Sequence, residues 1–333
     1  MKEHSGSFAK ILQVFPDPTR HYLEVWHAMV RLADAFEDTP GKGYMQKATS
    51  LDLLAEYAAN QRPLHKAILS TQAETFLEEW ANSEKQSVDA AVLRDAKIIL
   101  DEYSQLPKKA KNIIQHHLAT MVVGMIDFLP EGYAHPYNKI KTFHDFYTYS
   151  TIVGGVTGDG ITDLLLEGDS IDARTHKQLQ TQSPTASMNV GVFLQYVNMI
   201  KDVYEDAKQN KHALPTKEPG FLHNGKYTLQ AINETARQAL SHLDNAVEYL
   251  LILPKKAVAT RRFIATALTK YVQRLAHYAN NPSLLTEKPV LAKDQQYKDY
   301  AMLALQYYGG YMSNRLAVRI MDKSVERINH ALR

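Results

Sequence analysis

The feature that most constrains the fold is an acidic triplet placed at the end of an apolar helical stretch. In residues 189–215, apolar side chains recur at helical spacing over the first half of the stretch. The triplet that follows is Asp202, Glu205 and Asp206. Its spacing of i, i+3 and i+4 places all three side chains on one face of a helix.

A second copy of this arrangement occurs earlier in the chain. Residues 25–38 again form an apolar helical stretch, and a Thr-Pro-Gly breaker follows it. The stretch ends in a triplet with the same spacing: Asp34, Glu37 and Asp38. A basic residue precedes the first acid in each copy, Arg31 in one and Lys201 in the other.

Crowded carboxylates repel one another unless a cation lies among them. Hard oxygen ligands on a rigid helix suit Mg²⁺, which commonly links a few carboxylates to substrate phosphates. A single acidic run is usually a solvated helix face, but two matched copies favour a functional site. We therefore predict Mg²⁺ ligands at six residues: Asp34, Glu37, Asp38, Asp202, Glu205 and Asp206.

Five segments, in the same order, resemble the squalene and phytoene synthases, which are head-to-head prenyl synthases. The resemblance extends from residue 5 to about residue 293. The matching segments are Ser7-Phe8-Ala9, the two acidic motifs at 31–38 and 191–206, the Gly-Met-x-x-Phe-Leu element at 124–129, and the Tyr-x-x-x-Val-Gly-Gly-x-x-Gly signature at 149–158. Within this family, the Phe-Leu-Gln sequence of the second motif and the 124–129 element resemble squalene synthases more than phytoene synthases.

The resemblance implies a role for each matched residue. The two triplets would hold Mg²⁺ on facing walls of one cavity, with their carboxylates within about 15 Å of each other. Tyr149 would assist removal of a proton as the cyclopropane ring of the reaction intermediate closes. The other implied catalytic residues are Asp34, Asp38, Asp202 and Asp206. The implied substrate-binding residues are Phe8, Arg31, Gln195, Asn198, Lys201 and Lys211.

The resemblance also implies an apolar environment rich in aromatic faces, because prenyl coupling forms a carbocation that must be kept from water. The candidates are Phe8, Phe36, Tyr149, Phe193 and Tyr196. Periodicity alone would assign these rings to core packing, and the resemblance singles out Phe8 and Tyr149.

The chain departs from the family pattern at several positions. Lys201 and Lys211 stand where the family usually has arginine, which keeps the charge and loses bidentate geometry. The other departures are Gly6 for an arginine, His27 for a tyrosine and Gly154 for an alanine.

The implied reaction joins two farnesyl diphosphates head-to-head, through presqualene diphosphate, to squalene, with Mg²⁺ throughout and NADPH in the second step. The Tyr-Ala-Asn-Asn stretch beginning at residue 278 resembles a squalene synthase segment beside the cofactor. Lys288 and Lys293 would then contact phosphates of NADPH, although a solvated loop is the alternative and the family's Lys-Ile-Arg-Lys core is absent. The rival functions are a phytoene or dehydrosqualene synthase without reduction, and an inactive family member acting in binding or assembly.

The sequence predicts an all-α fold, since strand alternation persists nowhere. With no linker between halves, we expect one domain over 1–333, and the resemblance implies a helical bundle around a central cavity. Helices are expected at 87–106, 108–129, 227–253 and 255–278, and loops at 39–47 and 215–226. Gly154, Gly155 and Gly158 indicate close packing, a bend or a ligand against the backbone.

Composition excludes several classes of protein. The chain has no cysteine, which rules out disulfides and thiolate metal sites. A net charge of +2 without a basic stripe argues against nucleic acid. The sequence contains no run of about 18 apolar residues, so it predicts no transmembrane helix. We expect a cytoplasmic protein whose lipid substrate and product could bring it to a membrane surface, and the sequence leaves its oligomeric state open.

Overall fold

The computed structural model describes residues 11–39, 42–59, 88–129, 139–208, 211–287 and 314–333. These residues are helical apart from short turns and one small hairpin, which confirms the all-α fold class. Phe8, Lys288 and Lys293 lie outside the described residues. The contacts of the chain fall into two compact units, Met1–Lys139 with Asp159–Ser170, and Ile140–Gly158 with Ile171–Arg333. The single domain and its central cavity stay predictions.

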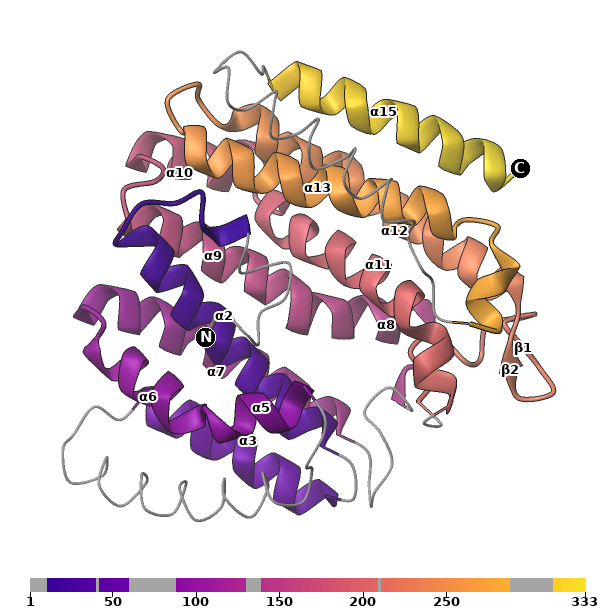
Figure 1. The fold of residues 1–333 in the computed structure, drawn as a ribbon, viewed down its shortest axis with the longest axis horizontal. Coiled ribbons are helices and arrows are strands. Elements are labelled where there is room, and N and C mark those ends of the chain that lie inside the picture. The colour runs from indigo at the N-terminus through magenta and orange to yellow at the C-terminus, as the bar shows by residue number, and fades with distance from the viewer. Residues whose placement is uncertain (1–10, 40–41, 60–87, 130–138, 209–210, 288–313) are drawn as a thin grey trace. The chain divides into compact units, whose positions relative to one another are not determined.

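The first unit is built on α2 (Thr19–Asp38), which packs against α3, α5, α6 and α7 (Figure 1). Its other elements are α3 (Tyr44–Ala59), α5 (Val88–Arg94), α6 (Ala96–Gln105), α7 (Lys108–Phe128) and the part of α9 (Val156–Glu167) from Asp159 onward. The expected end of the first acidic helix at residue 38 is confirmed.

Both ends of α2 are held by hydroxyl groups. Thr19 Oγ1 donates to the carbonyl of Gly168 at 2.5 Å, which ties the start of α2 to the residue after α9. Thr39 Oγ1 donates to the carbonyl of Ala35 at 2.5 Å, where α2 ends. Between them, Val25, Trp26 and Met29 are almost fully buried, so α2 is the core helix of this unit.

The second unit is centred on α11 (Ala186–Lys208), which packs against η2, α12 and α13 (Figure 1). The other elements are α8 (Phe143–Ser150), η2 (Thr151–Gly155), the first turn of α9, α10 (Ala173–Gln182), β1 (Leu222–His223), β2 (Lys226–Tyr227), α12 (Leu229–Ile252), α13 (Val258–Tyr278), η3 (Pro282–Leu285) and α15 (Asn314–Ala331). No helix among the described residues is long and apolar enough to cross a membrane.

Three local expectations were wrong. The helix expected at 87–106 is, in its described part, two helices, α5 and α6, which are separated at Asp95. The loop expected at 39–47 ends at Tyr44, where α3 begins. The loop expected at 215–226 contains the β1–β2 hairpin, because Asn224 and Gly225 adopt the positive φ angles that a tight two-residue turn requires.

The glycines of the 149–158 signature allow close helix packing. A Cβ atom added to Gly191 of α11 would lie 1.9 Å from the carbonyl oxygen of Gly154. A Cβ added to Gly158 would lie 2.3 Å from the carbonyl oxygen of Ser187. The backbones of η2, α9 and α11 therefore touch directly. Close packing is what these glycines provide, and a π-helical segment, η2, occurs at the same place.

We expect Gly191→Ala to destabilise the protein by about 2 to 3 kcal/mol, because its methyl group would meet rigid backbone. Gly155→Ala is the matched control. Its Cβ would meet the flexible Met188 side chain, so stability should stay within about 1 kcal/mol of the wild type. Urea denaturation followed by circular dichroism measures both, and equal midpoints for the two variants would contradict the packing argument.

Candidate active site

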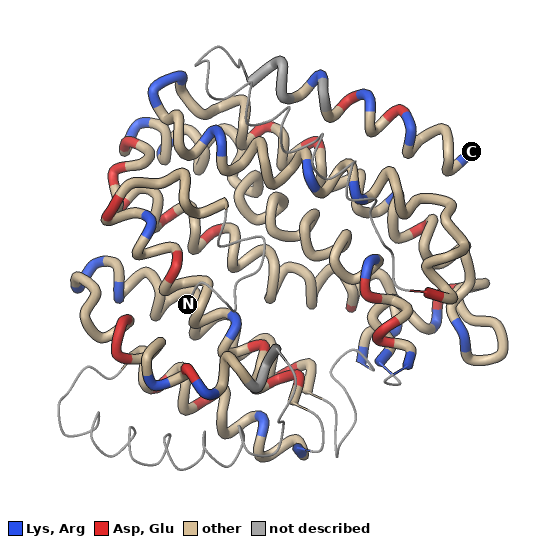
Figure 2. The backbone as a smooth tube through the Cα atoms, viewed as in Figure 1, with Lys and Arg blue, Asp and Glu red and all other residues tan. Residues whose placement is uncertain are grey.

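The polar residues predicted on α11 form one half-buried stripe. Gln195, Asn198, Asp202 and Glu205 follow one another by three or four residues, and each is partly exposed. The neighbouring residues Tyr196, Val197, Met199, Ile200 and Val203 are buried. The first half of α11 carries no charge, and the charged residues gather at its C-terminal end (Figure 2). The predicted common face is confirmed.

Lysines accompany the acids of the second motif. Lys201 Nζ lies 3.0 Å from Asp202 Oδ2, and Lys208 Nζ lies 3.5 Å from Glu205 Oε1. Lys208 Nζ also lies 4.0 Å from the centre of the Tyr204 ring. About a third of the side-chain surface of Lys201, Asp202 and Glu205 is exposed, so water screens these pairs. They can therefore exchange partners at small cost.

Lys211 is held in place by the backbone. Its main-chain N–H donates to the carbonyl of Asp206 at 2.9 Å, which keeps it beside the end of α11. The hydroxyl of Tyr227 accepts from the N–H of Leu214 and donates to its carbonyl. The hairpin thus anchors the short segment that carries Lys211, a half-buried residue.

The first motif, on α2, has a similar ion pair. Arg31 Nη1 lies 3.1 Å from Asp34 Oδ2, and both side chains are about 30% exposed. Glu37 is only 1% exposed, whereas Asp38, the last residue of the helix, is half-buried. Lys47, expected in a loop, is instead buried in α3 and donates from Nζ to the main-chain carbonyl of Glu37 at 2.6 Å. It braces the C-terminal end of α2.

His27, which replaces a family tyrosine, lies one turn before Arg31. Burial, together with the smaller effect of the charge of Arg31, lowers the pKa of its imidazole to about 4. The ring is therefore neutral near neutral pH. The substitution leaves Arg31 as the positive charge at this point of α2.

Tyr149 lies in the last turn of α8 and is 2% exposed. The π-helical segment follows at once, and the N–H of Val156 closes its five-residue ring on the carbonyl of Thr151. The predicted aromatic residues Phe36, Phe193 and Tyr196 are buried as well. Tyr196 stands edge-on to Phe146, with 4.3 Å between ring centres.

Sequence reasoning missed a set of residues on α13. Lys270, Arg274 and Tyr278 recur at i, i+4 and i+8, and α13 packs against α11. Burial raises the pKa of Tyr278 to about 12; Arg274 opposes this rise, and the negative charge of Asp202 adds to it. This effect places Tyr278 near the second acidic motif. The spacing was the only available signal, because the partner helix lies far away in sequence.

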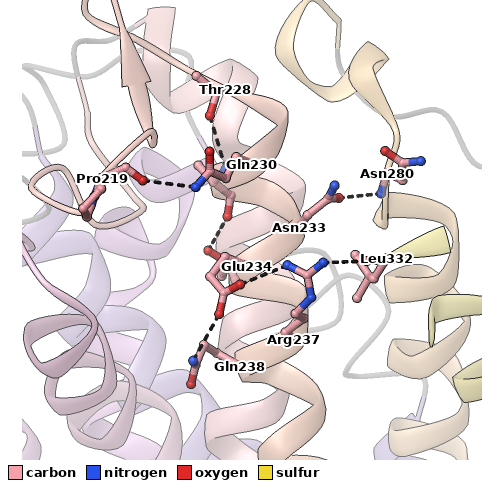
Figure 3. Close-up of polar contacts among 11 residues, drawn as sticks. Pro219, Thr228, Gln230, Asn233, Glu234, Arg237, Gln238, Asn280 and Leu332 are labelled. Atoms are coloured by element: carbon pink, nitrogen blue, oxygen red, sulfur yellow. Dashed lines mark hydrogen bonds and ion pairs between the residues drawn. The ribbon is translucent and has the colours of Figure 1, made fainter. Parts of the chain in front are cut away.

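The stretch predicted to reach NADPH therefore starts beside the second motif. Asn280, with a φ of 53°, donates its N–H to Asn233 Oδ1 of α12 at 2.7 Å. Figure 3 shows this contact beside Arg237, which donates to the carbonyl of Leu332 at 2.5 Å and pairs with Glu234. The Asn280–Asn233 contact fixes the base of the stretch to α12, and the Arg237–Leu332 contact joins α12 to the residue after α15.

The donor set fits a metal shared with substrate better than one bound by protein alone. Among the described residues, no three histidine or acidic side chains come together closely enough to hold a metal. Mg²⁺ needs only one or two carboxylates when phosphate oxygens and waters complete its octahedron. Partly exposed carboxylates such as Asp202 and Glu205 can supply such ligands.

Comparison with known sequences gives a consistent result. The profile of the family described as Squalene/phytoene synthase matches residues 1–295. The squalene synthase ERG9 of Saccharomyces cerevisiae is 26% identical over 294 residues, which cover 84% of this chain and 60% of that protein. The chain thus spans about three fifths of the length of the first curated relatives it matches.

Solved structures share the fold. TcSQS in complex with the ligand E5700 is 20% identical with a TM-score of 0.73, over 98% of this chain and 94% of that one. A dehydrosqualene synthase in complex with a ligand is 16% identical with a TM-score of 0.54, over 93% of this chain and 94% of that one. At these identities the likeness concerns the fold alone.

The lowered pKa of His27 predicts a loss of stability in acid. The unfolded chain binds a proton at this residue near pH 6.5, and the folded protein binds it only near pH 4. Stability should therefore fall as the pH falls between these values, and His27→Gln should remove that part of the fall. Urea midpoints of both proteins at pH of about 7 and about 4.5 measure the difference, and equal losses would contradict the assignment.

Proposed function

Because the chain belongs to the squalene/phytoene synthase family, we propose that it joins two farnesyl diphosphates head-to-head, through presqualene diphosphate, to squalene. The observation that carries the proposal is the half-buried polar stripe of α11, where Asp202 and Glu205 follow Gln195 and Asn198 on one face. A face of this kind can bind a charged headgroup at one end and remain enclosed at the other.

The first chemical step expels diphosphate from an allylic carbon. The carboxylates of the two acidic motifs would hold Mg²⁺, which would supply positive charge to the departing oxygens. Arg31, Lys201 and Lys211 would contact those oxygens directly, and Gln195 and Asn198 would orient the headgroup by hydrogen bonds. The proposal requires both triplets to share one diphosphate–metal cluster.

The ion pairs of the two motifs suit this role. Arg31 and Lys201 each lie beside the first acid of their motif, at 3.1 and 3.0 Å. When a diphosphate and its metal bind, each cation can turn to a phosphate oxygen while its carboxylate turns to the metal. The exchange replaces one charge-assisted contact by two, without leaving a charge unpaired.

The carbocation must then be protected and deprotonated. The buried ring of Tyr149 and the π-helical turn beside it would exclude water, and the face of the ring would favour positive charge. A phenol is a weak base near neutral pH, so Tyr149 would orient the proton that the released diphosphate accepts. The bond that breaks is C–H, and its electron pair closes the cyclopropane ring.

The reductive step is assigned to NADPH because of the stretch that begins at Tyr278. Its described part, up to residue 287, is anchored beside the second motif, so a nicotinamide held there would lie near the reacting carbons. Lys288 and Lys293 would contact the cofactor's phosphates. The rival activity omits the reductant and gives dehydrosqualene or phytoene.

Incubation with farnesyl diphosphate and Mg²⁺ should release diphosphate. A Glu205→Gln, Asp206→Asn variant should lose at least about 100-fold in rate, since it removes two of the predicted metal ligands. Its helical circular dichroism should be unchanged. Asp244→Asn, which alters an exposed carboxylate of α12, is the matched control and should keep full activity. No diphosphate release by the wild type under any condition would leave the binding or assembly role.

Mass spectrometry of the products separates the two enzymatic branches. With farnesyl diphosphate, Mg²⁺ and NADPH we expect squalene, and without NADPH we expect presqualene diphosphate or dehydrosqualene. Geranylgeranyl diphosphate in parallel tests the chain length. If NADPH leaves the product unchanged and dehydrosqualene or phytoene accumulates, the chain belongs to the non-reducing branch.

A further inference from the structure

The polar face of α13 brings positive charge to the second acidic motif. Lys270 and Arg274 lie one turn apart on α13, which packs against α11. Both contact one ring: Lys270 Nζ is 5.8 Å and Arg274 Cζ is 5.2 Å from the centre of Tyr271. Tyr271 thus holds the two cations on the same side of the helix.

Lys270 is buried, with 8% of its surface exposed. Removal from water, together with the smaller effects of the charges of Arg274 and Lys201, lowers the pKa of its ammonium group to about 7. The effect of Lys201 shows that Lys270 lies near the lysine paired with Asp202 at 3.0 Å. Three basic side chains from two helices therefore converge at the second motif.

We propose that Lys201, Lys270 and Arg274 form a phosphate-binding site that receives the substrate's diphosphate at the second acidic motif. Resting on the proposed function for the identity of that substrate, the site adds two α13 residues to the predicted headgroup contacts. A diphosphate needs several cations besides a metal, and three basic side chains held together gain most from a multiply charged anion, which also favours the charged form of Lys270.

The site also offers a guanidinium group that can bind two phosphate oxygens at once, which the lysine at position 201 cannot do. Where the family usually has arginine, Lys201 offers a point charge. Arg274 supplies a planar guanidinium from the neighbouring helix, half-buried and placed against the Tyr271 ring. Two oxygens of one phosphate group can then be bound by Arg274 while Lys201 and Lys270 neutralise the remaining charge.

Binding of inorganic diphosphate in the presence of Mg²⁺ tests the site without turnover. Isothermal titration calorimetry should show that Lys270→Met and Arg274→Gln each weaken binding by about 10- to 100-fold, as expected for charged hydrogen bonds. Lys323→Met removes an exposed charge from α15 and should bind as the wild type does. Wild-type affinity in both α13 variants, or no diphosphate binding by the wild type, overturns the proposal.

A second pair of variants guards against misfolding, because Lys270 is buried. Arg274 is only half-buried, and Arg274→Lys keeps its charge while removing its fork. Affinity should decrease in the order wild type, Arg274→Lys, Arg274→Gln, with thermal melts unchanged. Equal affinity in all three overturns the assignment of Arg274.

The phosphates of NADPH are the other source of this chemistry. Titration of NADPH into the same variants separates the two, because a diphosphate site should leave NADPH affinity within about twofold. Loss of NADPH binding with diphosphate binding intact overturns the proposal. A chain that binds diphosphate through Lys270 and Arg274 but releases none from farnesyl diphosphate would keep this site and lose the proposed function.

Discussion

The arrangement of the second unit depends on a direct backbone-to-backbone contact between η2 and α11. Gly154 and Gly191 leave no room for a Cβ atom between η2 and α11, and Gly158 meets Ser187 in the same way. The face of α11 that touches η2 continues, one turn at a time, into Gln195, Asn198 and Asp202. Packing of the glycines thus decides which way the acids point, and α12 and α13 enclose other sides of the helix.

Charge compensation follows the same principle in both motifs. Each first acid has a cation within about 3 Å, Arg31 for Asp34 and Lys201 for Asp202. Carboxylates clustered on one helix face would otherwise destabilise the helices that carry them. The cations keep the carboxylates ordered, and they remain exposed enough to change partner. The proposed headgroup and its metal would replace a balance of charge that already exists.

Local patterns in the sequence were sufficient to predict the all-α class, the end of α2 at residue 38 and the helix that carries the second triplet. Contacts between distant segments were not predictable in this way. Lys270 and Arg274 differ from ordinary helix-surface cations only because α13 packs on α11. Lys47 looked like a loop residue because glycine precedes it, yet tertiary packing extends α3 and buries its side chain under Glu37. The π-helical segment has no pattern of its own, since apolar residues and glycines suit an α-helix bend equally well.

The π-helical turn also sets the angular relation between the ring of Tyr149 and the glycines that follow it. A π turn accommodates one residue more than an α turn. A return of this turn to α-helical winding, with all its residues kept, would rotate Tyr149 by about 100° relative to the glycines that follow it. The tyrosine would then face a different neighbour while every helix kept its length. The direction of the Tyr149 side chain thus depends on the π winding of one turn, and a change in that winding acts as a change of direction.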